Sequence, residues 1–315
     1  MELSIEADTQ KQLKQGFKRR KRSELIYGLL FASPVLLGFL IFVLGPILIT
    51  FALGFTEYSI VGSPKFIGLD NYTRLFSGQD PFFYKSVTST LYYVIVSVPL
   101  GIAFSFLVAL LLNSKIKARG LFRGIFYLPV IIPLAASSMI WMWLLQPDFG
   151  VVNYVLSSLH LPTSPWLSSD TTVIPTLIIF SLWLTGNTIV IFLAGLQNIP
   201  AHLYEAIEVD GGNQFHKIMY ITLPMSSSII LFNTIIGFVN AFQTFVQPSV
   251  MTSGGPDNAS YLVVYYLFKE GFQFSRFGSA SAVAFLLFLV ILICTALLFK
   301  FSNSWVYYEG EERGK

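Results

Sequence analysis

The sequence predicts an all-α polytopic membrane protein with six transmembrane helices and with both termini in the cytoplasm. Hydrophobic residues make up 54% of its 315 residues and charged residues only 12%, whereas about a quarter of the residues in ordinary soluble domains are charged. The charges fall in short blocks between long uncharged stretches. Because a helix rises about 1.5 Å per residue, some 20 apolar residues cross a hydrocarbon core of about 30 Å.

Six stretches without Asp, Glu, Lys or Arg are the predicted spans. In hydrocarbon the backbone must satisfy its own hydrogen bonds, so these stretches are expected to be helices. Several contain proline, which kinks a helix and is tolerated where neighbours or water satisfy the freed carbonyl groups. The predicted spans cover approximately residues 27–55, 86–113, 124–145, 172–197, 225–250 and 279–299.

The distribution of lysine and arginine predicts the orientation. Seven of these residues lie in the tail before the first span, and four lie between the second and third spans. The loops that would then lie outside the membrane hold fewer lysine and arginine residues. The positive-inside rule therefore places both termini in the cytoplasm. A cleaved signal peptide is not expected, because the first apolar run is far longer than such peptides use. The predicted parts are a basic tail over 1–26, a transmembrane domain over 27–301 and a cytoplasmic tail over 302–315.

The sequence offers no catalytic centre. It has no phosphate-binding G-x-x-x-x-G-K motif, no metalloprotease or serine-hydrolase motif, one cysteine (Cys294) and three histidines. No enzyme activity, metal site or cofactor is therefore predicted for this chain. A carrier coupled to protons or sodium usually keeps ionisable groups at membrane depth, and these spans have none. Any driving energy must therefore enter from outside the membrane.

Four amide side chains of the fifth span predict a polar lining. On a continuous helix, residues 7, 10 and 14 positions after Asn233 fall within an arc of roughly 80°. Amides offer both donors and acceptors, which suits an uncharged polar solute such as a sugar. The alternative is hydrogen bonding between helices. The four residues are Asn233, Asn240, Gln243 and Gln247.

The fourth span contains a polar break, and transporters bind substrate near the midplane at such interruptions. A tryptophan beside the break can stack on a sugar ring, although packing is the alternative function of a membrane tryptophan. The candidate lining residues here are Trp183, Thr185, Asn187 and Thr188.

The most hydrophilic internal segment, residues 204–224, separates the fourth and fifth spans. Residues 201–209 are expected to form a helix, Gly211-Gly212 a chain reversal, and residues 213–221 a second short helix ended by Leu223-Pro224. The alternative is an amphipathic helix lying on the membrane surface. A protruding helical hairpin that docks on a cytoplasmic partner is the favoured interpretation.

This segment resembles the EAA loop of ABC importer permeases. The matching residues are Glu205-Ala206, Asp210-Gly211 and the run from Ile221 to Pro224, whereas Ile207 and Gly212 replace the usual alanines. The stretches FIGLDNY, RGLFRGIFYLP, MTSGGPDNAS and FGSASA resemble the maltose-type and glycerol-3-phosphate-type sugar importers. The resemblance covers nearly the whole chain from the first span onward.

The resemblance implies a mechanism and a set of partners. The loop would seat a coupling helix in a cleft of a cytoplasmic ATPase dimer, where ATP and magnesium bind, and an extracytoplasmic solute-binding protein would deliver the solute. One chain supplies one loop for two clefts, so a second, related permease chain is expected, as a heterodimer in the bacterial cytoplasmic membrane. The expected coupling residues are Tyr204, Glu205, Ala206, Ile207, Asp210, Gly211 and Gly212.

The sequence thus predicts the permease subunit of a binding-protein-dependent ABC importer for a carbohydrate, with an oligosaccharide expected. Glycerol phosphate, a polyol or an amino acid are alternative solutes. A phosphate would favour a basic group in the cavity, and the predicted spans contain none. A stand-alone channel and an intramembrane enzyme are the alternatives from other functional classes.

Overall fold

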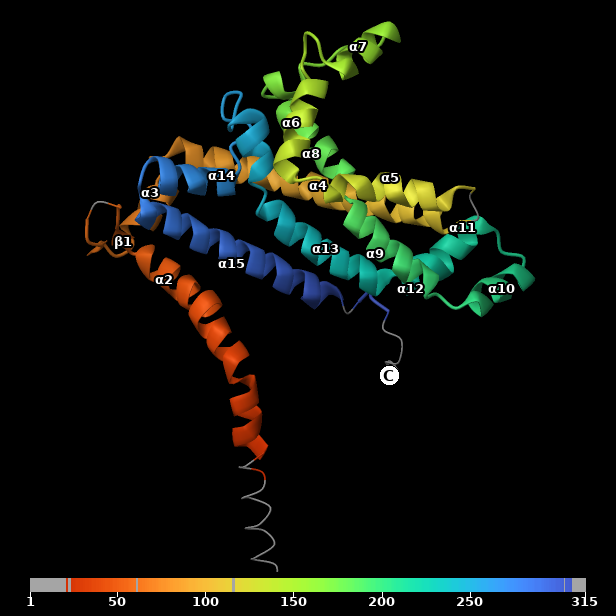
Figure 1. The fold of residues 1–315 in the computed structure, drawn as a ribbon, viewed down its shortest axis with the longest axis horizontal. Coiled ribbons are helices and arrows are strands. Elements are labelled where there is room, and N and C mark those ends of the chain that lie inside the picture. The colour runs from red at the N-terminus through yellow and green to blue at the C-terminus, as the bar shows by residue number, and fades with distance from the viewer. Residues whose placement is uncertain (1–20, 22–23, 61, 115–116, 303, 308–315) are drawn as a thin grey trace, which may run out of the picture. The chain divides into compact units, whose positions relative to one another are not determined.

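The computed structural model describes residues 21, 24–60, 62–114, 117–302 and 304–307, and these are mainly helical (Figure 1). Three predicted features lie wholly or partly outside the described residues. They are most of the basic N-terminal tail, Lys115 in the basic loop between the second and third predicted spans, and the end of the C-terminal tail. Three helices are long and apolar enough to cross a membrane, and three bent helix pairs bring the number of spans to six if each pair crosses once. The predicted helical, polytopic fold class is confirmed.

Residues 24–53 form one helix and belong to a unit of their own. The helix contains a π-turn, η1 (Leu40–Leu44), followed by α2 (Gly45–Leu53). In this turn the Gly45 N–H donates to the Leu40 carbonyl, five residues back. Because the next residue, Pro46, has no N–H to donate, the wider turn accommodates the proline without ending the helix.

The second unit, which starts at residue 54, is built around the straight helix α4 (Pro81–Asn113). Helices α8 (Val173–Trp183), α9 (Gly186–Gln197) and α13 (Ser227–Phe242) pack along it. Two clusters of buried apolar side chains lie on α4, one shared with α8 and α13 and one shared with α9. The long helix α15 (Phe277–Ser302) packs on α13.

Two of the predicted spans are bent pairs of helices, and the fifth forms a third such pair with the segment that precedes it. The pair of α5 (Arg119–Ile131) and α6 (Leu134–Leu144) turns by 104°, and the pair of α8 and α9 by 47°. The helical stretch over 214–225 meets α13 at 64°. The first bend lies at Pro133, which cannot continue a hydrogen-bonded helix from the preceding turn.

Two expected helix ends were wrong. The second short helix does not end at Leu223-Pro224: it continues through the π-turn η3 (Ile218–Thr222) and α12 (Leu223–Met225). The Leu223 N–H donates to the Ile218 carbonyl, and this wider turn makes room for the following proline. The fifth span was expected to run to residue 250, but α13 ends at Phe242, where the next N–H bonds a carbonyl only three residues back.

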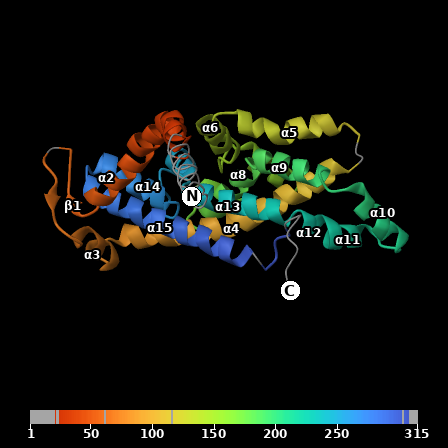
Figure 2. The same ribbon diagram turned by 90° about the horizontal axis from the view of Figure 1, so that it is seen from below.

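The two ends of the second unit are different in character (Figures 1 and 2). We call one the hairpin end; it holds a two-stranded antiparallel hairpin and three short helices. We call the other the loop end; it holds the segment between the fourth and fifth spans. The hairpin-end elements are β1 (Thr56–Glu57), β2 (Lys65–Phe66), α3 (Asp70–Phe76), α14 (Val263–Phe268) and η5 (Lys269–Gln273). The loop-end elements are α10 (Ala201–Val209) and α11 (Gln214–Lys217). The remaining short elements are α7 (Val151–Ser158), η2 (Trp166–Ser168) and η4 (Pro248–Thr252).

The hairpin end is fixed to α4 and α15 by specific hydrogen bonds. Asp80 caps α4 by accepting from the Phe82 N–H at 3.0 Å, and its other oxygen accepts from the Tyr266 hydroxyl at 2.8 Å. Burial raises the pKa of Tyr266, so its hydroxyl remains protonated and remains a donor. The Asn71 amide donates to the carbonyls of Gly54 and Thr56, each at 2.9 Å.

Close packing of β1 on α15 leads to a stability prediction. A β-carbon at Gly278 would lie 1.9 Å from the Thr56 carbonyl oxygen, a backbone atom that cannot move aside freely. Gly278→Ala is therefore expected to destabilise the fold by about 1–3 kcal/mol, as overpacking does, and to lower the thermal unfolding temperature in detergent. Gly120→Ala is the matched control, because a β-carbon there meets nothing within 4 Å. Equal unfolding temperatures for the two variants would contradict the predicted clash.

Candidate functional site

A polar cavity of about 270 Å³ lies where α4, the break between α8 and α9, and the end of α13 meet. Among the described residues, those that line it include no charged side chain. Its polar groups are amides and hydroxyls, and its apolar groups come from α4, from α13 and from Leu184 in the break. The polar lining residues are Tyr93, Ser97, Ser181, Thr185, Thr188, Asn233, Asn240, Thr244 and Gln247.

The break between α8 and α9 brings its polar residues to this cavity. At the end of α8 the Thr185 N–H bonds the Leu182 carbonyl at 3.2 Å, and the Thr185 hydroxyl bonds the same carbonyl at 2.7 Å. Gly186 then starts α9 in close contact with α5, since a β-carbon there would lie 2.5 Å from the Phe126 carbonyl oxygen. The tight helix end and this glycine together place the break between α4 and α5.

A second, more open cavity of about 720 Å³ adjoins the first and is bounded by α5, α9 and α13. The two share Thr188, Asn233 and Asn240. Arg123 also lines the second cavity, and its buried Nε has no hydrogen-bond partner among the described residues. The predicted spans contain no basic residue, and Arg123 directly precedes the third of them. Because α5 begins at Arg119, this guanidinium nevertheless belongs to the helix that lines the cavity.

The structure brings most of the candidate lining residues together. Thr185, Thr188, Asn233, Asn240 and Gln247 line the first cavity, and Asn187 lines the second.

Two candidate lining residues lie elsewhere. Trp183 packs in the core, with its ring centroid 5.7 Å from that of Trp141 and 6.1 Å from that of Phe180. Gln243 is exposed and lines neither cavity. It follows the last residue of α13, so the arithmetic of a continuous helix does not apply to it.

Sequence reasoning missed the contribution of α4 to the cavity. Ser97 and Gly101 line it from that helix, and Ser181 and Thr244 line it from positions beside the two helix ends. Serine and threonine are common in membrane helices, where their hydroxyls bond the backbone of the preceding turn. Their presence alone was therefore no signal of a cavity.

At the loop end, α10 and α11 form the expected helical hairpin. Gly211 has a φ of +79°, a conformation that favours glycine, and its N–H bonds the Glu208 carbonyl at 3.1 Å. The Gly212 N–H bonds the Ile207 carbonyl at 2.8 Å, which completes a Schellman motif. Asn213 then caps α11 by accepting from the His216 N–H at 3.0 Å.

The predicted coupling residues divide between two faces of the hairpin. Glu205, Ala206, Asp210 and Gly211 are exposed, whereas Tyr204, Ile207 and Gly212 are half-buried against the rest of the chain. The neighbouring Val209 is 87% exposed.

The hairpin is tied internally by two side-chain interactions. The Tyr204 hydroxyl lies 3.1 Å from the Thr222 hydroxyl, which joins α10 to η3. Lys217 of α11 pairs with Glu208 of α10. Tyr204 is therefore a positioning residue within the loop rather than part of its exposed face.

Comparison with known proteins identifies the family. Residues 101–307 match the family described as "Binding-protein-dependent transport system inner membrane component". The probable ABC transporter permease protein YesP of Bacillus subtilis is 37% identical over 298 residues, which is 93% of this chain and 96% of that protein. The arabinooligosaccharides transport system permease protein AraP of the same species is 30% identical over 286 residues, 90% of this chain and 89% of its own.

A solved structure supports the same assignment. One chain of a bacterial alginate ABC transporter, crystallised with an alginate pentasaccharide-bound periplasmic protein, superposes with a TM-score of 0.77 and 25% identity. The match covers 91% of this chain and 96% of that chain. The predicted resemblance to ABC importer permeases is thereby confirmed, and the chain belongs to the binding-protein-dependent transport system inner membrane components, the membrane permease subunits of ABC importers.

Proposed function

We propose that this chain is the permease subunit through which an ABC importer moves a neutral carbohydrate, an oligosaccharide, across the bacterial cytoplasmic membrane. The observation that carries the proposal is the uncharged polar cavity beside the broken helices α8–α9 and α13. Broken membrane helices expose backbone groups that must face protein or a hydrated cavity, which is where transporters bind solute. Two similar proteins, AraP and the alginate transporter, are named for saccharide solutes, which supports a saccharide as the solute of this chain.

The side chains of the cavity suit sugar hydroxyls. A hydroxyl is both donor and acceptor, and the amides of Asn233, Asn240 and Gln247 offer both functions within one lining. Because the described lining residues carry no charge, a neutral solute can bind there without desolvating an ion. The volume of about 270 Å³ accommodates part of a saccharide chain, and the adjoining open cavity accommodates more.

Arg123 favours a second candidate, a solute carrying a carboxylate or phosphate group. A guanidinium binds such a group in a planar, bidentate arrangement, and Arg123 lines the cavity that shares Asn233 and Asn240 with the first. Acidic saccharides and glycerol phosphate belong to this class.

The partners follow from the two exposed surfaces. We infer that the exposed face of α10 docks on a cytoplasmic ATPase dimer, which holds ATP and magnesium, because this chain contains no phosphate-binding motif. The open cavity on α5, α9 and α13 faces a second permease chain, a heterodimer partner that completes the pathway. A solute-binding protein delivers the saccharide at the hairpin end, the end of the second unit opposite to α10.

Removing one cavity amide tests the solute site. Asn240→Ala is expected to lower solute uptake about tenfold, because an amide that hydrogen-bonds the solute contributes roughly 1–2 kcal/mol. Uptake of labelled oligosaccharide into proteoliposomes containing the assembled transporter measures the effect. Gln243→Ala is the matched control, because this amide lies outside both cavities. Equal uptake by the two variants would assign the amides to packing alone.

Neutralising Arg123 distinguishes the two solute classes. Arg123→Gln is expected to change uptake of a neutral oligosaccharide less than threefold, since no charge on that solute needs the guanidinium. Competition by neutral and acidic saccharides against the transported solute is the measurement. A loss of at least tenfold confined to acidic saccharides would favour the anionic class instead.

Charging the exposed face of α10 tests the coupling surface. Val209→Glu alters a side chain that is 87% exposed, so folding is expected to persist while ATPase binding weakens about tenfold or more, as at a hot spot. Co-purification of the ATPase subunits and uptake measure the outcome. Val151→Glu on α7, also an exposed valine, is the control. Full ATPase binding by the Val209 variant would exclude this face as the docking surface.

A further inference from the structure

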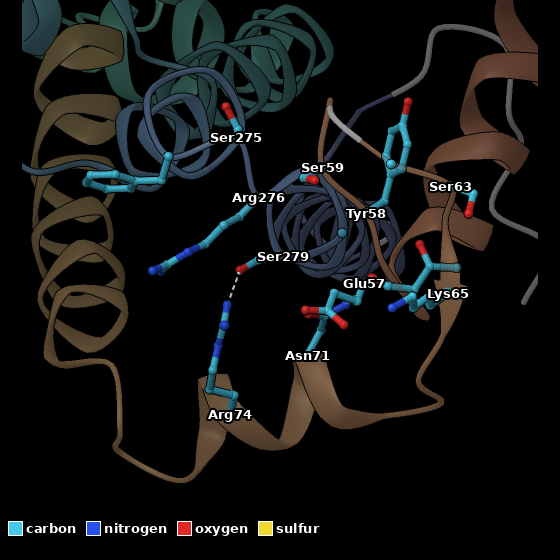
Figure 3. Close-up of a pocket in the computed structure, with 14 residues that line it drawn as sticks. Glu57, Tyr58, Ser59, Ser63, Lys65, Asn71, Arg74, Ser275, Arg276 and Ser279 are labelled. Atoms are coloured by element: carbon cyan, nitrogen blue, oxygen red, sulfur yellow. Dashed lines mark hydrogen bonds between the residues drawn. The ribbon is translucent and has the colours of Figure 1, made fainter.

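A third cavity, of about 490 Å³, lies at the hairpin end and shares no lining residue with the two cavities described above. It is enclosed by the β1–β2 hairpin, α3 and the chain that leads into α15 (Figure 3). Three cations line it, Lys65, Arg74 and Arg276, against one acidic residue, Glu57. Figure 3 shows Arg74 reaching up from α3 and Arg276 extending into the same space.

A buried carboxylate holds the two arginines beside this cavity. Glu270 is only 2% exposed, and its oxygens lie 3.7 Å from Arg74 and 3.6 Å from Arg276. These distances exceed those of hydrogen bonds, so most guanidinium donors are not used by Glu270. Arg74 donates once, to the Ser279 hydroxyl at 2.8 Å, and its buried Nε has no hydrogen-bond partner among the described residues. After both carboxylates are counted, one positive charge remains at the cavity.

The position of the cavity along the spans sets its depth. Arg276 directly precedes the apolar helix α15, and Arg74 lies shortly before Pro81, where α4 begins. Both helices are long and apolar enough to cross a membrane. Charged residues at the very start of a span lie where the hydrocarbon ends and the headgroups begin. We therefore expect Arg74 and Arg276 to lie at headgroup depth, with Lys65 lining the same cavity.

Several large apolar side chains of the hairpin end are exposed. Phe66, which follows Lys65, is 80% exposed, and Phe274, which lines the cavity, is 55% exposed. Leu69, Phe76 and Phe272 nearby are exposed by about as much, at 61%, 59% and 66%. Exposed apolar groups at the same end as a cluster of cations are typical of a surface that enters the membrane interface.

We propose that this cavity binds the headgroup of an anionic phospholipid. The phosphate lies between the guanidiniums of Arg74 and Arg276 with Lys65 beside it, and the acyl chains run along the exposed phenylalanines. A soluble docking protein would also match the charge, but it would leave these phenylalanines in water between docking events. The combination of spare donors, headgroup depth and an apolar rim favours the lipid.

Relative lipid affinity in the assembled transporter tests the proposal. The complex is placed in nanodiscs of equal parts phosphatidylglycerol and phosphatidylcholine, and the association of spin-labelled forms of each lipid is compared. Lys65→Gln and Arg276→Gln are each expected to lower the preference for phosphatidylglycerol about fivefold, as for one cation near an anionic surface. Arg276→Gln still leaves Glu270 paired with Arg74, so it avoids an unpaired buried charge.

Three controls make the result decisive. Lys85→Gln removes an exposed cation of the same end that lies outside the cavity, and it is expected to leave the preference unchanged. An equal fall in Lys85→Gln, or no fall in the two cavity variants, would overturn the proposal. The proposal would also be overturned if inorganic phosphate, added to the complex in nanodiscs of phosphatidylcholine alone, raised its thermal unfolding temperature as much as phosphatidylglycerol does. Weaker binding of the solute-binding protein with unchanged lipid preference would assign the surface to protein docking instead. None of these results depends on the identity of the transported solute.

Discussion

The arrangement of this protein depends on one constraint, that every backbone donor and acceptor at membrane depth must be satisfied. The helix α4 meets it over 33 residues with a single interior proline. Helices α8 and α13 do not continue: each ends inside the unit, at Trp183 and Phe242. Both ends lie against α4, and residues beside both line the same cavity. The cavity proposed to bind the solute thus forms at the place where broken helices would otherwise leave peptide groups unpaired.

This constraint also explains how much of the fold the sequence predicts. Charge-free stretches mark the spans because a charge in hydrocarbon is expensive, and helices appear near all six predicted positions. The Gly211-Gly212 reversal follows from local chemistry, since only a few residues around the turn determine it. Both features depend on solvent or on neighbours in sequence, and such information is present in a single chain.

The residues that sequence reasoning misplaced depend on tertiary contacts. Gln243 and Asn240 look alike as amides at helical spacing, but α13 ends between them and only Asn240 reaches the cavity. Trp183 adjoins a polar break, yet the rings of Trp141 and Phe180 hold it in the core. Arg123 was missed for a different reason, because a charged residue was taken to end a span although α5 contains it. Where a helix ends, and what faces it, is decided by distant segments.

The same geometry links the loop end to the solute cavity through one continuous path. The second arm of the hairpin runs through η3 and α12 and meets α13 at a 64° bend near Ser226. The hydrogen bond between Tyr204 and Thr222 fixes α10 to this arm, and the C-terminal segment fixes the start of α13, where the Tyr307 N–H donates to Ser227 at 2.8 Å. If α10 docks on an ATPase as proposed, we expect a displacement of α10 to be carried along this arm to α13, the helix that bears Asn233 and Asn240. The π-turn at η3 keeps the arm helical despite Pro224, so the proline does not interrupt the path.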